Sequence, residues 1–271
     1  MAFRPKENRI LTALAKGKIP LGMQVYTGNP SIIEILAYTG FDYYMLDMEH
    51  SRVNPETMEH CIRAADAAGI TTLVRVTENN PSLIRQAIEA GAQGVIVPHV
   101  ENAQDARRAV DSIRYPPEGK CGTCGCIRAG NYKGAGYMEY SNQNTMLIPL
   151  LEDKNAIENA EEIFAQLKPG LDAVGVGRGD LANSLRTEPG QNTGGMLPGE
   201  QHPYIKEAYD KVLSISRKSG IPLIDNVFGP DDAKVTVDKG VKILLYMIDQ
   251  WHFYNFCEDV VRMVKKLKPP K

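Results

Sequence analysis

TTLVRVTENNPSLIRQAIEAGAQGVIVPHV, residues 71–100, contains the unit from which the whole chain is built. Residues 71–76 and 94–100 are nearly continuous in apolar character, as strands covered on both faces must be. Between them, residues 81–91 carry apolar side chains at helical spacing and end at a glycine, the usual C-terminal stop of a helix. The stretch therefore predicts a strand, a helix and a second strand of a parallel sheet.

The same alternation continues to the C-terminus without a linker. Further strand candidates lie at 20–27, 41–47, 146–152, 172–177, 221–227 and 242–249. Further helix candidates lie at 31–40, 55–69 and 102–115, and residues 1–18 predict a short amphipathic helix. Eight strand–helix units predict an α/β fold of the (β/α)8 TIM-barrel type, with residues 1–271 as a single domain. An open doubly wound sheet is the alternative.

Composition favours small-molecule chemistry. The 271 residues carry a formal net charge of −2 with no long run of lysine and arginine, which argues against nucleic-acid or membrane-surface partners. No stretch of about 18 apolar residues is present, and the N-terminus lacks the features of a secretory signal. Five cysteines, an odd number, argue against a disulfide framework. We expect reduced thiols and a cytoplasmic location.

Charged side chains follow several predicted strands directly. In a (β/α)8 barrel the chemistry lies at the C-terminal ends of the strands, so these residues fall at the predicted catalytic rim. Taken singly, each is better explained as a rim ion pair or a helix cap. Their number favours an active site, and the residues are Asp47, Glu49, His50, Arg75, Glu152 and Asp180.

Two of these carboxylates predict a metal site. Glu152 and Asp180 end adjacent strands and offer hard oxygen ligands, which suit Mg²⁺ or Mn²⁺ with positions left open for substrate. A 2-oxo acid would chelate such a metal through its carboxylate and ketone, and the metal would polarise the carbonyl. Arg75 adds a positive charge beside the developing enolate oxygen. His50 moves the proton, with Asp47 or another carboxylate setting its tautomer.

The segment GVGRGDLANSL, residues 175–185, has a second interpretation as a phosphate or dinucleotide loop. The spacing of the nucleotide fingerprint is absent, and no acidic residue for a ribose follows at the right distance. A helix that starts in this segment can still bind a carboxylate through free backbone N–H groups.

Several motifs occur together in one order: GFDYYMLDMEH, LVRV, EAGAQGVIVPHV, RYPPEG, a glutamate that ends the fifth strand, and GRGDLANSL. Over residues 18–186 this order resembles the metal-dependent (class II) pyruvate aldolases of the hydroxy-oxo-heptanedioate aldolase type, in the citrate lyase beta-like, phosphoenolpyruvate/pyruvate barrel superfamily. The resemblance implies a TIM barrel that reversibly cleaves a 4-hydroxy-2-oxo acid to pyruvate and an aldehyde.

The resemblance also implies roles for single residues. Glu152 and Asp180 are implied as ligands of a divalent cation, Mg²⁺ or Mn²⁺ or else Co²⁺ or Zn²⁺. His50 is implied as the acid–base residue, and Arg75 as the group that stabilises the enolate. Asp47 is implied as the acid beside His50 and the metal's water.

Contacts with substrate and with other subunits are implied in the same way. The family forms homo-oligomers, usually hexamers built as a trimer of dimers, with C-terminal helices exchanged between neighbours. Glu89 stands where the family has an aspartate that reaches His50 of a neighbouring subunit. The backbone amides of Gly179 and Asp180 are implied to bind the pyruvate carboxylate.

The chain departs from the family at three positions near the predicted pocket. Arg178 replaces a proline of the family, and Cys121 replaces an arginine. Near Gln24, the family usually has an aromatic residue. We therefore predict that Arg178 and Gln24 contact substrate. Cys121 predicts a substrate tail that differs from the acidic tails of the family's substrates.

Cys121 belongs to a cysteine-rich stretch, GKCGTCGC at 119–126, in the first of two long connections, 115–145 and 186–203. A structural zinc would need a fourth ligand that has no paired spacing, and a redox pair would have to open a helix. Small, weakly polar loop residues are the favoured interpretation. Aromatic residues in IDQWHFYNF, 248–256, predict helix packing at a subunit interface.

Other functions share parts of this chemistry. Decarboxylation of an oxaloacetate-like acid uses the same enolate, and a lyase acting on acyl thioesters is a variant from the wider superfamily. A non-catalytic scaffold on the same barrel is a third alternative. The retention of all four candidate groups, His50, Arg75, Glu152 and Asp180, argues against the scaffold.

Overall fold

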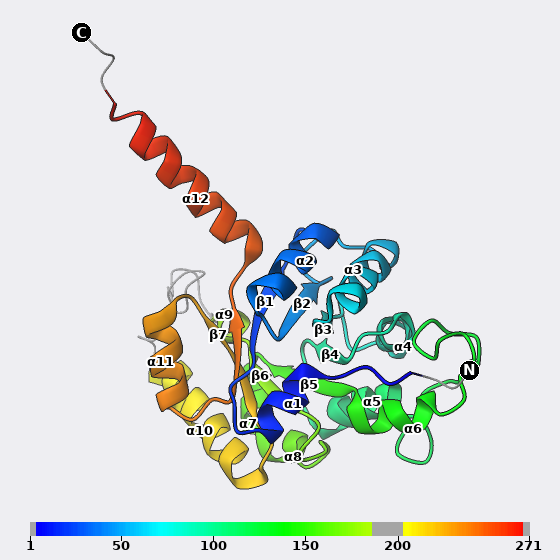
Figure 1. Ribbon diagram of the computed structural model, residues 1–271. Helices are drawn as coiled ribbons and strands as arrows, with labels where there is room; N and C mark the ends of the chain where they lie inside the picture. The colour runs from blue at the N-terminus through cyan, green and yellow to red at the C-terminus, as the bar shows by residue number, and fades with distance from the viewer. Residues whose placement is uncertain (1–3, 186–202, 268–271) are drawn as a thin grey trace.

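The computed structural model describes residues 4–185 and 203–267 and shows a closed barrel of eight parallel strands in sequence order (Figure 1). Closure comes from the pairing of the first strand with the last, with Gly22 opposite Leu245. The TIM-barrel prediction is confirmed, and the open-sheet alternative is wrong. The strands are β1 Leu21–Val25, β2 Tyr43–Asp47, β3 Thr71–Arg75, β4 Gly94–Val97, β5 Met146–Leu151, β6 Val174–Val176, β7 Leu223–Val227 and β8 Ile243–Tyr246.

The helices surround the barrel or close its ends. Their bounds are α1 Arg9–Ala15, α2 Pro30–Thr39, α3 Pro55–Ala68, α4 Pro81–Ala90, α5 Ala103–Ile113, α6 Tyr137–Asn144, α7 Lys154–Glu158, α8 Ala160–Phe164, α9 Arg178–Ser184, α10 Pro203–Ser219, α11 Pro230–Asp238 and α12 Asp249–Val264. All three helices predicted between strands at 31–40, 55–69 and 81–91 are present as α2, α3 and α4. The helix predicted at 102–115 is α5.

Asparagine side chains cap the start of five of these helices, the first being Asn8 at α1. The side chains of Asn29, Asn54, Asn80 and Asn102 each accept a backbone N–H of the first turn, which satisfies a donor that the helix itself leaves unpaired. α4 ends at Gly91, whose φ of 111° is accessible to glycine at little cost. Local chemistry therefore sets the ends that the sequence pattern predicted.

The long connection at 115–145 contains a helix that the sequence did not predict, α6. Its sequence, YMEYSNQN, has little apolar periodicity, but Tyr137, Ser141 and Asn142 are buried. Asn142 accepts the N–H of Tyr115 at 2.7 Å and donates to its carbonyl at 2.9 Å. Contacts with the rest of the protein therefore decide this helix. The second long connection lies almost entirely outside the described residues.

Two apolar cores lie on either side of the sheet. The larger one fills the space between the strands and the helices, and the smaller one fills the barrel itself. Tyr43 occupies the barrel interior beside Gly22, where a Cβ atom would lie 2.2 Å from the tyrosine ring. The Tyr43 hydroxyl donates to the Leu244 carbonyl at 2.7 Å. Ile10 of α1, fully buried, packs into this core from the N-terminal end of the barrel. The interior is therefore filled, and the opposite, C-terminal end is free for chemistry.

A buried ion pair lies toward the N-terminal end of β5. Arg114 pairs with Asp172 and donates to the Thr145 carbonyl at 2.7 Å, and both side chains are almost fully buried. Asp172 also accepts the N–H groups of Leu147 and Lys168, each at 2.9 Å. Both charges therefore have hydrogen-bond partners, as buried charges require.

The last helix, α12, projects away from the barrel, as Figure 1 shows in orange to red. Its first residue, Asp249, is buried and accepts the N–H groups of Tyr26 at 2.9 Å and Thr27 at 3.2 Å. The start of α12 therefore fixes the loop that follows β1. Farther along, large apolar side chains are exposed, among them Phe253, Tyr254, Phe256, Met263 and Val264. Within the described ranges, no helix combines the length and apolar character needed to cross a membrane.

Candidate active site

The strand ends place most of the predicted residues around one cavity. This cavity of about 170 Å³ opens at the C-terminal end of the barrel. Because the strands are parallel and in order, side chains at their carboxyl ends meet at the same rim. The predicted residues that line the cavity are Gln24, His50, Arg75, Glu152, Arg178, Gly179 and Asp180.

Asp47 forms hydrogen bonds with residues that line this cavity and organises the ends of two strands. It stands opposite Arg75 in the register of β2 and β3 and is fully buried. Its Oδ2 atom accepts from Arg75 Nε at 2.8 Å and from Gln24 Nε2 at 3.2 Å. Its Oδ1 atom accepts the backbone N–H groups of Glu49 and His50, both at 2.8 Å. Asp47 thus contacts His50 through the backbone, and it fixes the turn that carries Glu49 and His50.

Arg75 is held from three sides. Besides Asp47, it pairs with Glu49, whose Oε2 lies 3.0 Å from Nη1, and it donates from Nη2 to the Tyr26 hydroxyl at 3.3 Å. Burial acts to lower the pKa of Arg75, but the two carboxylates outweigh burial and raise it. Burial together with Asp47 also raises the pKa of Tyr26 to about 12. The cavity therefore contains a permanent, fixed positive charge.

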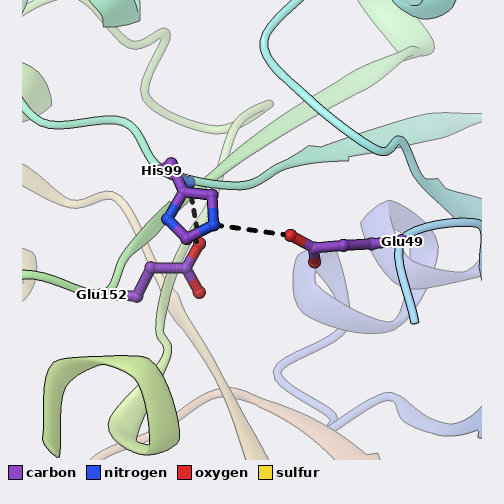
Figure 2. A group of neighbouring side chains, drawn as sticks. All are labelled: Glu49, His99 and Glu152. Carbon is purple, nitrogen blue, oxygen red and sulfur yellow. Dashed lines mark hydrogen bonds and ion pairs between the residues drawn. The ribbon is translucent and has the colours of Figure 1, made fainter. Parts of the chain in front are cut away.

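Glu49, His99 and Glu152 form a compact group (Figure 2). Glu49 joins this group to Arg75, with which it pairs. His99 Nδ1 lies 3.3 Å from Glu152 Oε1, and His99 Nε2 lies 3.6 Å from Glu49 Oε1. One ligand atom from each residue lies within 4.8 Å of the others. The backbone of His99 has a φ of 52°, a left-handed conformation that is uncommon outside glycine, and its N–H donates to Glu152 Oε1 at 2.7 Å.

The electrostatics of Glu152 fit a cation. Burial, helped by the nearby charges of Glu49 and Asp180 and opposed by the His99 N–H and imidazole, raises the pKa of Glu152 to about 7. Burial also raises the pKa of Glu49. A Cβ atom on Gly177 would lie 2.3 Å from Glu152 Oε2, so glycine at the end of β6 leaves room for this carboxylate. Clustered carboxylates with one imidazole suit a divalent metal ion.

Asp180 and His50 lie at the rim of the same cavity. Asp180 is in the first turn of α9, half-buried, and it is near enough to Glu152 to affect its pKa. His50 is exposed, and its Nε2 lies 3.7 Å from Glu49 Oε2. The predicted ligand pair Glu152 and Asp180 therefore shares the cavity, with Glu49 and His99 as additional ligand candidates.

Arg178 lies on the β7 side of the cavity. It pairs with Asp225, with Nη2 3.1 Å from Oδ1, and donates to the Asn226 carbonyl at 3.4 Å. Gln24 reaches the cavity from β1 and also donates to the Tyr26 hydroxyl at 3.2 Å.

Glu89 does not line the catalytic cavity of its own chain. It lies on α4, beside a separate groove of about 890 Å³ between α3, α4 and residues 127–132. Its carbonyl accepts the N–H of Ala129 at 3.0 Å. A catalytic contribution from Glu89 therefore requires a second subunit.

The cysteine stretch is also separate from the catalytic cavity. The Cys121 thiol is buried in the outer core and donates to the Gly122 carbonyl at 3.5 Å, and burial raises its pKa. Cys124 and Cys126 are exposed. In the part of the chain that the structure describes, none of the three joins a group with the composition of a metal site. Cys121 lines a different depression, with Arg85 and Arg108, so it does not reach a substrate in this subunit's cavity.

Glu49 and His99 are the residues that sequence reasoning did not assign. Glu49 stands in the polar run after β2, but no role followed from its position. His99 lies two residues after the end of β4, at the same rim as the other candidates, and this position was the available signal.

The same rim therefore brings together the carboxylate–imidazole group, His50 and the guanidinium of Arg75. The chain is a carbon–carbon lyase of the class II aldolase type. A family model agrees: residues 21–255 match HpcH/HpaI aldolase/citrate lyase, and the chain belongs to this metal-dependent family.

Individual relatives support the same assignment. The 2-dehydro-3,6-dideoxy-6-sulfogluconate aldolase of Pseudomonas putida is 33% identical over 211 residues, which cover 78% of each protein. The hydroxypyruvate/pyruvate aldolase of Sagittula stellata is 30% identical over 246 residues, or 90% of this chain and 92% of that protein. The crystal structure of an HpcH/HpaI aldolase/citrate lyase family protein from Burkholderia cenocepacia superposes with a TM-score of 0.85 at 26% identity, covering 96% and 100% of the two chains.

Proposed function

We propose that this protein reversibly cleaves a 4-hydroxy-2-oxo acid to pyruvate and an aldehyde. The observation that carries the proposal is the fixed guanidinium of Arg75, 3.0 Å from Glu49, beside the group formed by Glu49, His99 and Glu152. A 2-oxo acid whose carbonyl lies between a positive charge and a metal ion is activated for enolate formation. Two relatives are named as aldolases, and one of them is named for pyruvate and hydroxypyruvate.

The metal ligands in this proposal are Glu152 and Asp180, with Glu49 and His99 as further candidates. When bound, the ion supplies Lewis-acid charge that polarises the ketone of the substrate. Carboxylate oxygens favour Mg²⁺ or Mn²⁺, whereas the imidazole of His99 also suits Co²⁺ or Zn²⁺.

Groups of this chain carry out proton transfer, enolate stabilisation and carboxylate binding in this proposal. In the cleavage direction, His50 accepts the proton of the C4 hydroxyl, the C3–C4 bond breaks, and its electrons move to the enolate oxygen beside Arg75. Protonation of the enolate at C3 gives pyruvate. Asp47 keeps Arg75 in position through two hydrogen bonds. The backbone amides of Gly179 and Asp180 bind the carboxylate.

Gln24 and Arg178 complete the substrate contacts in this proposal. Both side chains line the cavity, and both present N–H donors. An oxygen-rich substrate is the natural partner of such donors.

Deuterium exchange tests the proposal directly. Pyruvate is incubated in D₂O with the Mn²⁺-loaded or Mg²⁺-loaded protein, and its methyl signal is followed by NMR. We expect exchange with metal and none after chelation, because only an enolate exchanges the methyl protons. Metal-loaded protein that neither exchanges these protons nor releases pyruvate from hydroxy-oxo acids would contradict the proposal.

A His50→Asn variant separates the aldolase from a decarboxylase. Retro-aldol cleavage needs a base for the C4 hydroxyl proton, whereas loss of CO₂ from oxaloacetate needs none at that position. We expect the variant to lose cleavage of hydroxy-oxo acids about a hundredfold. Oxaloacetate decarboxylation that greatly exceeds aldol cleavage in the wild type would favour the decarboxylase instead.

The proposed assembly is a homo-oligomer, a hexamer formed as a trimer of dimers with exchanged α12 helices. The exposed aromatic side chains of α12, such as Phe253 at 69% and Phe256 at 65%, support it, since large apolar patches mark interaction sites. In such an assembly Glu89 would approach His50 of a neighbouring subunit. Light scattering of the full chain measures the mass, and a monomer would contradict the proposal. A cytoplasmic location stays a prediction from the sequence.

A further inference from the structure

We propose that the hydroxyl of Tyr26 is a further catalytic group, which donates a hydrogen bond to the C4 oxygen of the substrate while the C3–C4 bond breaks or forms. The inference rests on the proposed aldolase function and adds to it the stabilisation of the second reacting oxygen. Tyr26 follows β1 directly and is half-buried.

The Tyr26 hydroxyl accepts two hydrogen bonds and has a proton that the protein does not use. It accepts from Gln24 Nε2 at 3.2 Å and from Arg75 Nη2 at 3.3 Å. A phenolic oxygen accepts through its lone pairs and carries one hydrogen of its own, which therefore points away from both donors. Within residues 4–185 and 203–267, this hydroxyl donates to no protein group. Because Tyr26 lines the catalytic cavity, its proton is available to a ligand there.

The surroundings of Tyr26 make its hydroxyl a donor and not a base. Burial and the charge of Asp47 raise the pKa of Tyr26 to about 12, so the hydroxyl keeps its proton at neutral pH. Arg75 donates to the hydroxyl oxygen and strengthens it as a donor, because hydrogen bonds in a chain polarise one another. The Tyr26 hydroxyl therefore extends the electrostatic effect of Arg75 to a second substrate oxygen.

The position of Tyr26 in the barrel places it on the aldehyde side of the substrate. In a closed ring of eight strands in sequence order, β1 lies opposite β5. Glu152 follows β5 directly, and in the proposed function it binds the metal together with Asp180, so the 2-oxo acid end lies on that side. The rest of the substrate extends toward β1, where Tyr26 lines the cavity of about 170 Å³.

Arg75 and Tyr26 are adjacent, as are the two reacting oxygens of the substrate. C2 and C4 of a 4-hydroxy-2-oxo acid are joined through C3 alone, so their oxygens can lie side by side. Arg75 Nη2 and the Tyr26 oxygen are 3.3 Å apart, so a C2 oxygen beside Arg75 brings the C4 oxygen within reach of Tyr26. His50 lies near the same pair, since Glu49 contacts both His50 and Arg75.

Tyr26 and His50 act on the C4 oxygen in different ways. In the cleavage direction, His50 removes the C4 hydroxyl proton, and negative charge develops on the oxygen before the C3–C4 electrons reach the enolate. Tyr26 keeps its own proton and stabilises this charge through its hydrogen bond. In the reverse direction, the same hydrogen bond polarises the aldehyde carbonyl, and His50 returns the proton. Deuterium exchange into pyruvate involves no C4 oxygen, so loss of the Tyr26 hydroxyl should affect exchange far less than cleavage.

The test compares two reactions of the metal-loaded full-length protein, in wild type and in Tyr26→Phe. One is pyruvate release from a panel of 4-hydroxy-2-oxo acids that begins with 4-hydroxy-2-oxopentanoate, and the other is deuterium exchange into the pyruvate methyl group. The deciding quantity is the ratio of kcat for cleavage to kcat for exchange. We expect Tyr26→Phe to lower this ratio about thirtyfold, because a donor to a developing charge is lost. Tyr38→Phe is the matched control, since Tyr38 is 78% exposed on α2, and it should leave the ratio unchanged.

Asp249→Ala tests the same inference with the Tyr26 hydroxyl in place. Asp249 accepts the backbone N–H groups of Tyr26 and Thr27, and it is not among the residues that line the cavity, so it is a positioning residue. Its loss should lower the same ratio about fivefold, because the segment that carries Tyr26 is held less firmly. If Tyr26→Phe fails to fold, an unchanged ratio in Asp249→Ala would overturn the inference.

The outcomes separate this inference from the proposed function. If wild-type protein exchanges and cleaves but Tyr26→Phe lowers both rates equally, Tyr26 acts only on the enolate through Arg75, and the inference is wrong while the aldolase stands. A rise in KM for the hydroxy-oxo acid with kcat unchanged would also overturn it, since the hydrogen bond would then form equally in the bound substrate. Wild-type protein that gives no exchange, or exchange without cleavage of any acid in the panel, contradicts the proposed function first.

Discussion

Replacing Glu152 with glutamine should stabilise the metal-free protein at neutral and alkaline pH. Glu152 is 2% exposed, and burial with two neighbouring carboxylates raises its pKa from 4.5 to about 7. Each pKa unit corresponds to about 1.4 kcal/mol, so keeping Glu152 ionised in the folded protein costs about 3 kcal/mol. Glutamine has nearly the same shape, and its carbonyl can still accept the N–H of His99.

The sign follows from proton linkage. A carboxyl group whose pKa is raised by folding contributes stability that is complete below pH 4.5 and is lost as the pH rises through about 7. The advantage of Glu152→Gln over wild type should therefore be under about 1 kcal/mol at pH 5 and about 3 kcal/mol at pH 8. For a chain of this size, about 2 °C accompanies each kcal/mol, which predicts a Tm difference near 6 °C at pH 8.

Thermal unfolding after exhaustive chelation measures this difference at both pH values. The matched control is Glu158→Gln on α7, where the carboxylate is 60% exposed and pairs with Lys154. The control should show no growth in Tm difference between pH 5 and pH 8. A Glu152→Gln advantage that stays constant, or a variant less stable than wild type at pH 8, would refute the reasoning. Added Mn²⁺ should then raise the Tm of wild type more than that of Glu152→Gln.

Three further outcomes follow from the geometry. His99→Ala should weaken Mn²⁺ binding at least about tenfold, as measured by calorimetry. The control is His60→Ala, since His60 is exposed on α3, and it should leave Mn²⁺ binding unchanged. Equal Mn²⁺ affinities of the two variants would show that His99 is not a ligand. Arg75→Met should lower kcat for pyruvate deuterium exchange by about a hundredfold or more with a smaller change in KM, and a pure KM effect would make Arg75 a binding residue only. Asp172→Ala should cost about 3–5 kcal/mol in urea unfolding because Arg114 is left buried without its partner, and a loss below 1 kcal/mol would show that water reaches the pair.

The barrel could be predicted because local and global signals agree in this chain. The strands are nearly continuous apolar runs, and helices such as α4 are marked by Asn80 at the start and Gly91 at the end. Helix α6 lacked such signals, since its burial depends on Tyr115 and other residues that the sequence cannot bring near. Periodicity reports local preference, and it does not report contacts made across the fold.

The sequence predicted several residues of the active site, but it did not predict how they lie relative to one another. Strand ends identified Arg75 and Glu152, because their charges interrupt or follow apolar runs. The sequence did not reveal that Asp47 faces Arg75 in register, since register depends on how the strands pair. His99 was missed for a similar reason. Its position as a ligand candidate follows from the parallel pairing of β2 through β5, which places the carboxyl ends of these strands at one rim, and from a left-handed backbone at His99 itself.

Asp249 shows that the functional unit of this chain is longer than its barrel. The last strand, β8, ends at Tyr246. The loop after β1 is held by hydrogen bonds to Asp249, three residues further on, at the start of α12. A protein truncated after residue 264 would keep these hydrogen bonds. One truncated before Asp249 would retain all eight strands and still release Tyr26, whose hydroxyl contacts Arg75. Fusions, tags and minimal catalytic fragments should therefore be designed around the first turn of α12, and not around the end of the sheet.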